Sequence, residues 1–259
     1  MSTLIVIPAR LGATRLPNKP LRLLGGMPLV LRVWERVSRM NIADRVVIAT
    51  DADEIARVCL AAGAEVAMTR ADHPSGTDRV AEVARLKEFQ GSDVIVNVQG
   101  DEPYISEAAV QGAAAMVAGG RFSLGTAAVA ADSAILANSD VVKVVTAADG
   151  RALYFSRAPI PFLRDASDAP RQASLVRQHL GVYAYTAMAL ARWVSLPPHP
   201  LELTERLEQL RPLADGLAMG VAFVASAVGG GIDTEDDLTR ANAAWNEASH
   251  TPPAAGAQR

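Results

Sequence analysis

The sequence predicts an α/β protein built on a Rossmann-like, mostly parallel sheet that carries a smaller antiparallel extension. Two observations lead to this fold class. Short apolar segments rich in β-branched residues alternate regularly with amphipathic helical segments from Leu4 to Val98. After that point the apolar segments become less regular and are separated by fewer helical patterns. Strands that follow a βαβ half in this way often form an antiparallel extension, which could carry a substrate lid and a subunit interface.

The first half of the chain supplies the elements of the parallel sheet. Leu4–Ile7 is a short, unbroken run of apolar residues that favour β-strands, which is typical of a strand buried on both faces. Val30, Val33 and Val37 recur at helical spacing within a predicted helix over Pro28–Met40. Further strands are predicted at Arg45–Ala49, Glu65–Met68 and Asp93–Val98, and further helices at Glu54–Ala62 and Asp78–Phe89. Strand and helix in alternation predict right-handed crossovers that cover both faces of the sheet.

The second half predicts the extension and the end of the domain. Strands are expected at Leu124–Ala130, Val141–Thr146, Leu153–Ser156, Gly181–Tyr185 and Val221–Ala225. Helices are expected at Ala187–Val194, His199–Leu210 and Glu235–Trp245. We therefore expect one domain over residues 1–248, with a core at about 1–130 and 210–248 and an extension at about 131–209. The small, proline-rich tail at 249–259 is expected to be disordered.

Composition excludes several classes of protein. The net charge of −3 provides no basic field for nucleic acid or an anionic membrane. The longest unbroken apolar run, Ala113–Ala118, is too short to span a bilayer, and the N-terminus lacks the basic region of a signal peptide. Cys59 is the only cysteine, and the four histidines show no zinc-ligand spacing. These features predict a cytoplasmic globular protein that binds neither nucleic acid nor membrane.

The loop after the first strand carries the first candidate site. It reads P-A-R-L-G-A-T-R-L-P-N-K-P-L over Pro8–Leu21, and it contains neither G-x-G-x-x-G nor G-K-[ST]. Arg10, Arg15 and Lys19 lie on this small-residue loop, at the carboxyl end of a strand where open α/β sheets bind ligands. Three cations on such a backbone suit a polyphosphate, whereas the alternative is an ordinary solvated basic loop.

Two carboxylates are candidates for holding Mg²⁺. Asp101 directly follows a predicted strand and a glycine that would let a phosphate come close, although it could also be a turn-forming aspartate. Asp233 precedes Thr234-Glu235-Asp236-Asp237, which resembles a capping box, so Asp233 could simply favour the helix dipole. Thr77, in Ser75-Gly76-Thr77, has a similar ambiguity between a helix N-cap and a ligand contact.

Pro8–Leu21 resembles the signature loop of the cytidylyltransferases that activate 3-deoxy-manno-octulosonate (Kdo). It is more distantly similar to the sugar-nucleotide pyrophosphorylases. The resemblance continues, in order, through Ala49–Asp51, Met68–Arg79 (M-T-R-A-D-H-P-S-G-T-D-R), Val96–Pro103 (V-N-V-Q-G-D-E-P), Ala152–Pro161, His179–Tyr185, Leu207–Arg211 and Gly231–Leu238 (G-I-D-T-E-D-D-L). These motifs cover nearly the whole chain, so the chain is identified as a member of that family rather than only of the fold.

The resemblance implies a nucleotide-diphospho-sugar transferase fold and a Mg²⁺-dependent transfer of CMP from CTP to Kdo. The reaction would release pyrophosphate and activate Kdo for lipopolysaccharide synthesis. CTP would be bound by Pro8, Ala9, Arg10, Arg15, Lys19, Ser75, Gly76 and Gln99, with Arg10, Lys19 and Asp101 as the catalytic residues. Asp101 and Asp233 would ligate Mg²⁺, and Kdo would be bound by Arg157, Arg164, His179, Tyr183, Glu208 and Gln209. The resemblance also implies a homodimer.

The sequence leaves alternatives open for the acceptor, for catalysis and for several of the site residues. The acceptor could be a related sugar acid, such as 8-amino-Kdo or a sialic acid, and the chain could also be a non-catalytic nucleotide-sugar binding protein. Arg164 could form a surface ion pair with Asp165 or Asp168, and Glu208 and Gln209 could lie on the solvated side of a helix. Gln178 stands where arginine or lysine is expected in the family, which bears on sugar recognition and leaves the core reaction untouched.

Overall fold

The computed structural model describes residues 1–12, 15–225 and 230–250. Its strands are β1 (Thr3–Ala9), β2 (Leu23–Leu24), β3 (Met27–Pro28), β4 (Arg45–Thr50), β5 (Glu65–Met68), β6 (Val94–Asn97), β7 (Leu124–Ala130), β8 (Lys143–Thr146), β9 (Ala152–Ser156), β10 (Arg177–Tyr185) and β11 (Met219–Val224). Its α-helices are α1 (Leu29–Ser38), α2 (Asp53–Ala61), α3 (Gly76–Arg85), α4 (Glu107–Ala118), α5 (Ala169–Leu175), α6 (Ala187–Ser195), α7 (Pro200–Glu205), α8 (Leu210–Ala214) and α9 (Glu235–His250). Short 3₁₀ helices are η1 (Lys19–Leu21), η2 (Ser133–Ala137) and η3 (Ala166–Asp168).

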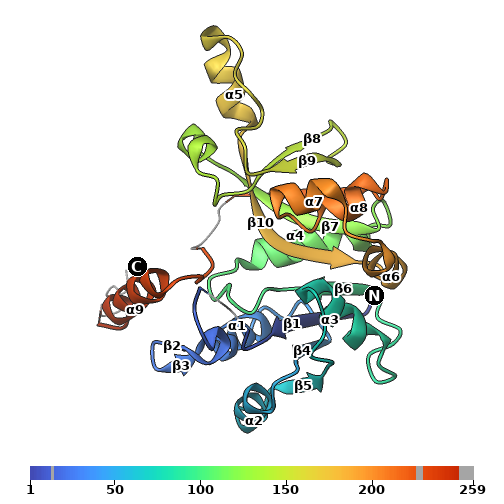
Figure 1. Cartoon of the computed structure of the whole chain (residues 1–259), viewed down its shortest axis with the longest axis vertical. Helices are drawn as coiled ribbons and strands as arrows, with labels where there is room; N and C mark the ends of the chain where they lie inside the picture. Colours follow the sequence, from blue (N-terminus) through green and yellow to red (C-terminus); the bar gives the residue numbers. More distant parts are fainter. Residues whose placement is uncertain (13–14, 226–229, 251–259) are drawn as a thin grey trace, which may run out of the picture.

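One large mixed sheet organises the described part of the molecule (Figure 1). Its main path runs β11-β7-β10-β6-β1-β4-β5. β1 pairs in parallel with β4 and β6, β4 pairs in parallel with β5, and β11 pairs in parallel with β7. β10 alone runs antiparallel within this path, between β6 and β7. The predicted fold class is thereby confirmed.

Helices cover both faces of the sheet, which produces two apolar cores. Val30, Val33 and Val37 of α1, Ile55 and Cys59 of α2, and the alanines of α4 pack on one face. α3, α6 and the α7–α8 region pack on the other face, where Trp193 is fully buried. Cys59 lies in the core as its predicted position on an apolar helix face requires, and burial raises the pKa of its thiol to about 11.

A third, smaller apolar cluster lies outside the two main cores. It consists of Leu16, Leu24, Leu29, Ile232 and Leu238, with Tyr104, Ala241 and Trp245 packed against it. These residues come from the loop after β1, the β2–β3 hairpin, α1 and the segment that leads into α9. The cluster therefore joins the C-terminal helix to the loop that follows β1.

The prediction of one helix over His199–Leu210 is wrong. α7 ends at Glu205, because the next residue, Arg206, has left-handed backbone angles (φ 55°), and α8 begins only at Leu210. The break brings Arg211 back to Glu202, where Arg211 Nε donates to Glu202 Oε2 at 2.8 Å. A continuous helix would separate these two residues by roughly 13 Å along its axis. Helix α4 was not predicted, because its buried face is made of small residues such as Ala109 and Ala113, which give little helical contrast.

The extension stands away from the sheet body in Figure 1. β8 and β9 pair antiparallel, and α5 projects beyond them at one end of the molecule. β8 contacts the large sheet through β10, which itself lies within that sheet. The division of the chain into core and extension stays a prediction. The predicted disordered tail falls mostly at residues 251–259, which lie outside the described residues.

Candidate active site

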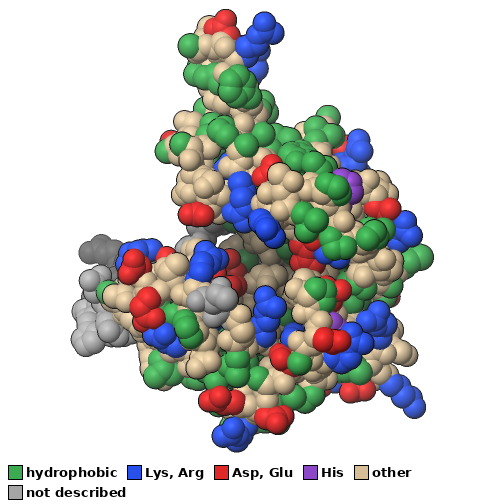
Figure 2. Space-filling model, in the orientation of Figure 1, with side chains coloured by type: hydrophobic (Ala, Val, Ile, Leu, Met, Phe, Trp, Pro, Cys, Tyr) green, Lys and Arg blue, Asp and Glu red, His purple; other side chains and the backbone are tan. Residues whose placement is uncertain are grey.

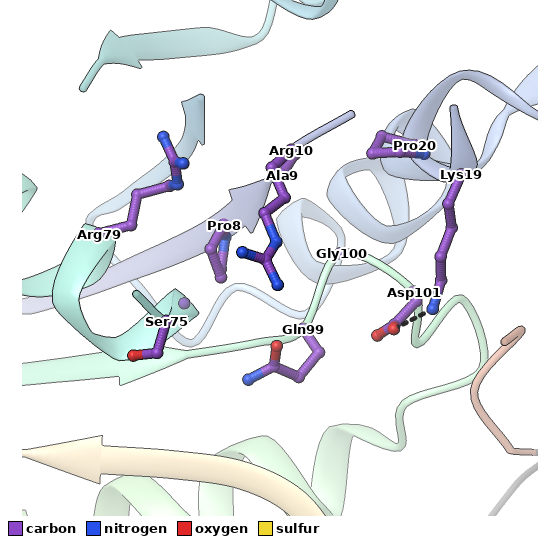
Figure 3. A pocket seen from close by; sticks show the side chains of 11 residues that line it. Pro8, Ala9, Arg10, Lys19, Pro20, Ser75, Arg79, Gln99, Gly100 and Asp101 are labelled. Carbon is purple, nitrogen blue, oxygen red and sulfur yellow. Dashed lines mark hydrogen bonds and ion pairs between the residues drawn. The ribbon is translucent and has the colours of Figure 1, made fainter. Parts of the chain in front are cut away.

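A cavity of about 220 Å³ opens at the carboxyl ends of β1 and β6 (Figure 3). It is lined by Pro8, Ala9, Arg10, Lys19, Pro20, Ser75, Gly76, Arg79, Gln99, Gly100 and Asp101. The structure therefore brings together every residue predicted for CTP except Arg15. Arg79, which was not among the predicted site residues, is buried and forms an ion pair with Asp51 at 2.9 Å. Its place in the Met68–Arg79 motif is the signal that could have found it.

Two glycines let the loops approach one another at this cavity. A Cβ atom on Gly100 would come within 2.8 Å of the Pro8 carbonyl oxygen. A Cβ atom on Gly76 would lie 3.3 Å from the Pro8 side chain. Because β1 and β6 are neighbours in the sheet, the loops that follow them must share this narrow space. Gly100 was expected to let a phosphate come close, and the atom that it lets come close in this structure is the Pro8 carbonyl oxygen.

Lys19 lies between the two carboxylates predicted to ligate a metal ion. Its Nζ donates to Asp101 Oδ2 and, at 2.7 Å, to Asp233 Oδ1. Burial lowers the pKa of Lys19, but the charges and hydrogen bonds of Asp101 and Asp233 outweigh that effect, so the pKa is raised. Arg15 contacts Asp233 Oδ2 at 3.0 Å. It does not line this cavity, nor the neighbouring cavity described below. Carboxylates far apart in the sequence therefore converge on one cation position.

The cap of α9 is made by residues other than Asp233. Thr234 Oγ1 accepts a hydrogen bond from Asp237 N (3.2 Å), and Asp237 Oδ2 accepts one from Thr234 N (2.9 Å). This reciprocal pair is the capping box that the sequence suggested. The Asp233 carboxylate is instead directed at Lys19 and Arg15. The cap of α3 is likewise Ser75, whose Oγ accepts from Asp78 N (3.3 Å), so the alternative of Thr77 as N-cap is wrong.

Glu102 adds a third acidic group beside the pair, and sequence reasoning missed it. It is half-buried, and burial together with the charges of Asp101 and Asp233 raises the pKa of its carboxyl to about 8. A Cβ atom on Gly231 would come within 3.0 Å of Glu102 Oε1. Its position next to Asp101 in Gln99–Pro103 is the signal that could have marked it.

The donor set fits Mg²⁺. Among the described residues, no three or more histidine, cysteine or acidic side chains are arranged to hold a metal ion. These residues therefore contain no metal site whose ligands all come from the protein. Asp101 and Asp233 offer carboxylate oxygens that already meet one cation, the Lys19 ammonium. Mg²⁺ usually takes one or two protein carboxylates and completes its shell with water and substrate phosphates. Two converging carboxylates beside a phosphate-sized cavity match that requirement.

A second cavity of about 340 Å³ adjoins the first at Asp101. It is lined by Asp101, Glu102, Ile105, Ser106, Asp140, Val141, Val142, Gln178, His179, Leu180, Gly181, Gly230, Gly231 and Asp233. Of the residues predicted for the sugar acid, only His179 lines it. Gln178, the departure from the family pattern, lines it as well.

His179 is buried and neutral. Thr126 Oγ1 donates its hydrogen to Val182 O (2.7 Å), so the His179 Nε2–H must donate to Thr126 Oγ1 (2.9 Å). The imidazole packs against the rings of Phe155 and Tyr183, with centroids 4.9 Å and 5.4 Å away. Burial lowers the pKa of His179 to about 3. The ring therefore offers Nδ1 as an acceptor and carries no charge at neutral pH.

Gln209 is buried and Glu208 is half-buried, so the alternative that placed both on a solvated helix face is wrong. They lie in the turn between α7 and α8. Glu208 accepts hydrogen bonds from Ser75 Oγ (2.7 Å) and Thr77 Oγ1 (3.1 Å), which ties it to the start of α3 at the first cavity. The pKa of Glu208 is raised, chiefly by burial. Burial also raises the pKa of Tyr183 well above its ordinary value.

The two arginines predicted for the sugar acid differ. The Arg157 guanidinium donates from Nε to the Glu205 carbonyl and from Nη1 to the Ser139 carbonyl, both at 2.9 Å. Arg164 is exposed, lies between β9 and η3, and lines neither cavity. Asp168, one partner suggested for it, pairs instead with Arg171 at 3.0 Å.

None of the described helices combines the length and apolar character that crossing a lipid bilayer would require.

Comparison with known proteins places this architecture in a family. Residues 4–219 match the family model described as cytidylyltransferase. A 3-deoxy-manno-octulosonate cytidylyltransferase from Gemmatimonas aurantiaca is 64% identical over 246 residues, which are 95% of each chain. A solved CMP:2-keto-3-deoxy-manno-octonic acid synthetase complexed with CTP is 36% identical, with a TM-score of 0.87 over 96% of this chain and 100% of that one.

More distant structures share the fold alone. An inositol-1-phosphate CTP transferase from T. maritima is 16% identical with a TM-score of 0.64, and covers 98% of each chain. A cytidylyltransferase from Leptospira borgpetersenii is 16% identical with a TM-score of 0.60, over 95% of this chain and 87% of that one. The family model and the 64% identical relative decide the assignment. The chain therefore belongs to the cytidylyltransferase family, and within it to the 3-deoxy-manno-octulosonate cytidylyltransferases.

Proposed function

We propose that the protein transfers CMP from CTP to the anomeric hydroxyl of 3-deoxy-D-manno-octulosonate, with Mg²⁺, and releases pyrophosphate. One observation carries the proposal: Asp101 and Asp233 converge on Lys19 at the edge of a cavity lined by the loop after β1. Figure 3 shows the contact between Lys19 and Asp101. A protein that only binds a nucleotide sugar has little use for two metal carboxylates. Because CTP is a cytoplasmic nucleotide, we place the reaction in the cytoplasm.

The chain supplies positioning and charge rather than a covalent intermediate. Arg10 and Lys19 line the cavity and would offset the negative charge on the α- and β-phosphates of CTP. Asp101 and Asp233 would hold Mg²⁺, which when bound neutralises phosphate charge and lowers the pKa of a hydroxyl beside it. The sugar hydroxyl would attack the α-phosphate in line with the departing pyrophosphate, held at near-attack distance by the two adjoining cavities.

Gln99, Ser75 and Gly76 would recognise the base. The Gln99 amide donates weakly to Asn97 Oδ1 (3.4 Å), which leaves its carbonyl oxygen as an acceptor in the cavity. Cytosine presents an amino donor where uracil presents a carbonyl oxygen, so an acceptor at this position discriminates between them. CTP should therefore be preferred over UTP, and comparable kcat/KM values for the two nucleotides would contradict this part of the proposal.

Neutral and cationic groups would share recognition of the sugar acid. His179 Nδ1 would accept from a sugar hydroxyl, and the half-buried Tyr183 and the buried Gln209 are suited to a polyol. Arg157 Nη2, the one guanidinium nitrogen that does not donate to a backbone carbonyl of a described residue, would contact the carboxylate, together with Arg164. Glu208, which already bonds Ser75, would join the sugar side to the nucleotide side.

We further propose that two copies form a homodimer through the extension. Leu153, Phe162 and Leu175 expose 52%, 80% and 51% of their surfaces on this part of the chain, and α5 projects from the body in Figure 1. Figure 2 shows hydrophobic side chains on the surface of this projection and at its base. Exposed apolar surface of this kind is typical of a contact surface. Sedimentation should give a dimer at micromolar concentration, whereas a monomer would defeat this proposal.

Pyrophosphate release measured with CTP and a panel of acceptors tests the main proposal. The panel contains Kdo, 8-amino-Kdo and a sialic acid, each with and without Mg²⁺. Turnover with Kdo, dependent on Mg²⁺ and at least tenfold faster in kcat/KM than with the other acceptors, is the expected result. A preference for another acceptor would overturn the substrate assignment, and no turnover with any acceptor would favour a binding protein.

A further inference from the structure

The C-terminal helix delivers Asp233 to the site, so what holds that helix in place bears on the chemistry. Asp233 immediately precedes the cap residue of α9. The segment before it is fixed at one point by a direct backbone bond, in which Ile232 N donates to the Asp101 carbonyl at 2.9 Å. The backbone of Asp101 is thus bonded to the residue that immediately precedes Asp233.

Asn242 connects α9 to the β2–β3 hairpin by hydrogen bonds. Its Oδ1 accepts from Gly25 N (2.9 Å), and its Nδ2 donates to the Leu23 carbonyl (3.0 Å) and to Leu238 O in its own helix (3.1 Å). One amide therefore bonds both a donor and an acceptor of the β2–β3 hairpin. Gly25 also lies flat on the indole of Trp245, since a Cβ there would come within 2.3 Å of Nε1.

The other contacts of α9 are less directional. Ile232 and Leu238 are buried among Leu16, Leu24 and Leu29, which drives association but tolerates small rotations. The ion pair between Arg22 and Glu235 (2.5 Å) is exposed and therefore weak. The Asn242 side chain accepts one hydrogen bond from the hairpin backbone and donates another to it. These two directional bonds would therefore define the angle of α9 on the hairpin.

We propose that Asn242 is a positioning residue that sets the register of α9 on the β2–β3 hairpin and thereby holds Asp233 against Asp101 and Lys19. Thr234 and Asn242 are about two helical turns apart, which is roughly 12 Å at about 1.5 Å per residue. A rotation of about 5° at the hairpin would move Asp233 by about 1 Å, and an error of that size at a catalytic group can cost about 100-fold in rate. The inference rests on the proposed role of Asp233.

Amide hydrogen exchange in the metal-free, ligand-free protein tests the positioning directly. Asn242→Ala should speed exchange of the Ile232 amide by about tenfold, because its bond to Asp101 opens more often once α9 is less constrained. Thr239→Ala is the matched control, since Thr239 is an exposed polar residue on the same helix, and it should leave this exchange unchanged. Unchanged exchange in Asn242→Ala would overturn the proposal.

Steady-state kinetics test whether Asn242 acts through Asp233. Asn242→Ala should lower kcat by about 10- to 100-fold and raise the Mg²⁺ concentration for half-maximal rate, with CTP affinity in the absence of metal nearly unchanged. Asn242→Asp keeps the acceptor for Gly25 N and should recover part of kcat. In an Asp233→Asn background, Asn242→Ala should change kcat by less than about twofold, because both changes disable the same group.

The outcomes separate this inference from the proposed function. If Asp233→Asn abolishes turnover while Asn242→Ala has wild-type kcat, the positioning role is wrong and the metal role of Asp233 stands. An undiminished effect of Asn242→Ala in the Asp233→Asn background would also overturn the positioning role. If Asp233→Asn itself keeps wild-type kcat and Mg²⁺ dependence, the metal role of Asp233 is wrong, while the exchange experiment still decides whether Asn242 holds the segment.

Discussion

Replacing His179 by glutamine should make the protein's stability less sensitive to acid. The imidazole is buried against Phe155 and Tyr183, and its pKa is lowered by burial to about 3 from an ordinary 6.5. Below pH 6.5, His179 therefore binds a proton in the unfolded chain but stays unprotonated in the folded chain. The contribution of neutral His179 to stability is complete above pH 6.5 and is lost as the pH falls from there toward 3.

The size of the effect follows from linkage. Between pH 6.5 and pH 5 the unfolded state gains about 1.4 kcal/mol per pH unit from protonating His179, which amounts to about 2 kcal/mol. Glutamine can still donate to Thr126 Oγ1, but it fills less of the space between Phe155 and Tyr183, so His179→Gln should destabilise the protein at pH 7.5. At pH 5 that penalty should be smaller by about 2 kcal/mol, because wild type alone has lost stability through this group.

Urea denaturation of wild type and variant at the two pH values measures the difference directly. Comparing the variant with wild type at each pH cancels the other titrating groups, among them Glu102. Phe155→Leu is a suitable control, because it loosens the same aromatic cluster but keeps the imidazole, so its penalty should not depend on pH. Equal penalties for His179→Gln at pH 7.5 and pH 5 would refute the conclusion that His179 stays neutral in the folded protein.

Three further predictions concern the site and its supports. Arg157→Ala should raise the KM for the sugar acid with little change in the KM for CTP, and an unchanged sugar KM in steady-state assays would place the carboxylate elsewhere. Lys143→Met should lower the free energy of unfolding by about 2–4 kcal/mol, because the buried ammonium donates to the carbonyls of residues 138, 141 and 157, and methionine would leave these acceptors without a donor. A loss below about 1 kcal/mol in urea denaturation would contradict this. Gly100→Ala should raise the KM for CTP at least tenfold, since its Cβ would lie 2.8 Å from the Pro8 carbonyl oxygen, and wild-type CTP kinetics would show that the loops can move apart.

The meeting of Arg10 and Asp101 at one cavity, the proposed nucleotide site, could be predicted because it follows from strand order. Arg10 follows β1 and Asp101 follows β6, and regular strand–helix alternation predicts parallel strands whose carboxyl ends meet at one edge. The observed pairing of Thr3 with Val94 and Leu4 with Ile95 makes β1 and β6 direct neighbours. Periodicity was sufficient here, because each element had a strong apolar pattern and short connections.

The position of Asp233 could not be predicted in the same way. β11 pairs with β7, on the other side of β10 and β6 from β1, so no strand order brings residue 233 to the β1 loop. What brings it there is packing of Ile232 and Leu238 against Leu16, Leu24 and Leu29, with hydrogen bonds from Asn242. Such long-range packing leaves no periodic signal, and only the resemblance to the family pointed to Asp233 as a ligand.

The sugar side depends on the direction of a single strand. β10 runs antiparallel to β6, with Tyr183 opposite Asn97 and Tyr185 opposite Ile95. Because β6 ends at Asn97, the residues of β10 before Tyr183 extend past it toward the carboxyl edge, where Asp101 lies. That overhang places Gln178 and His179 on the second cavity together with Asp101 and Asp233. A parallel β10 would have carried its first residues to the opposite edge, so this one reversal brings the predicted acceptor site beside the nucleotide site.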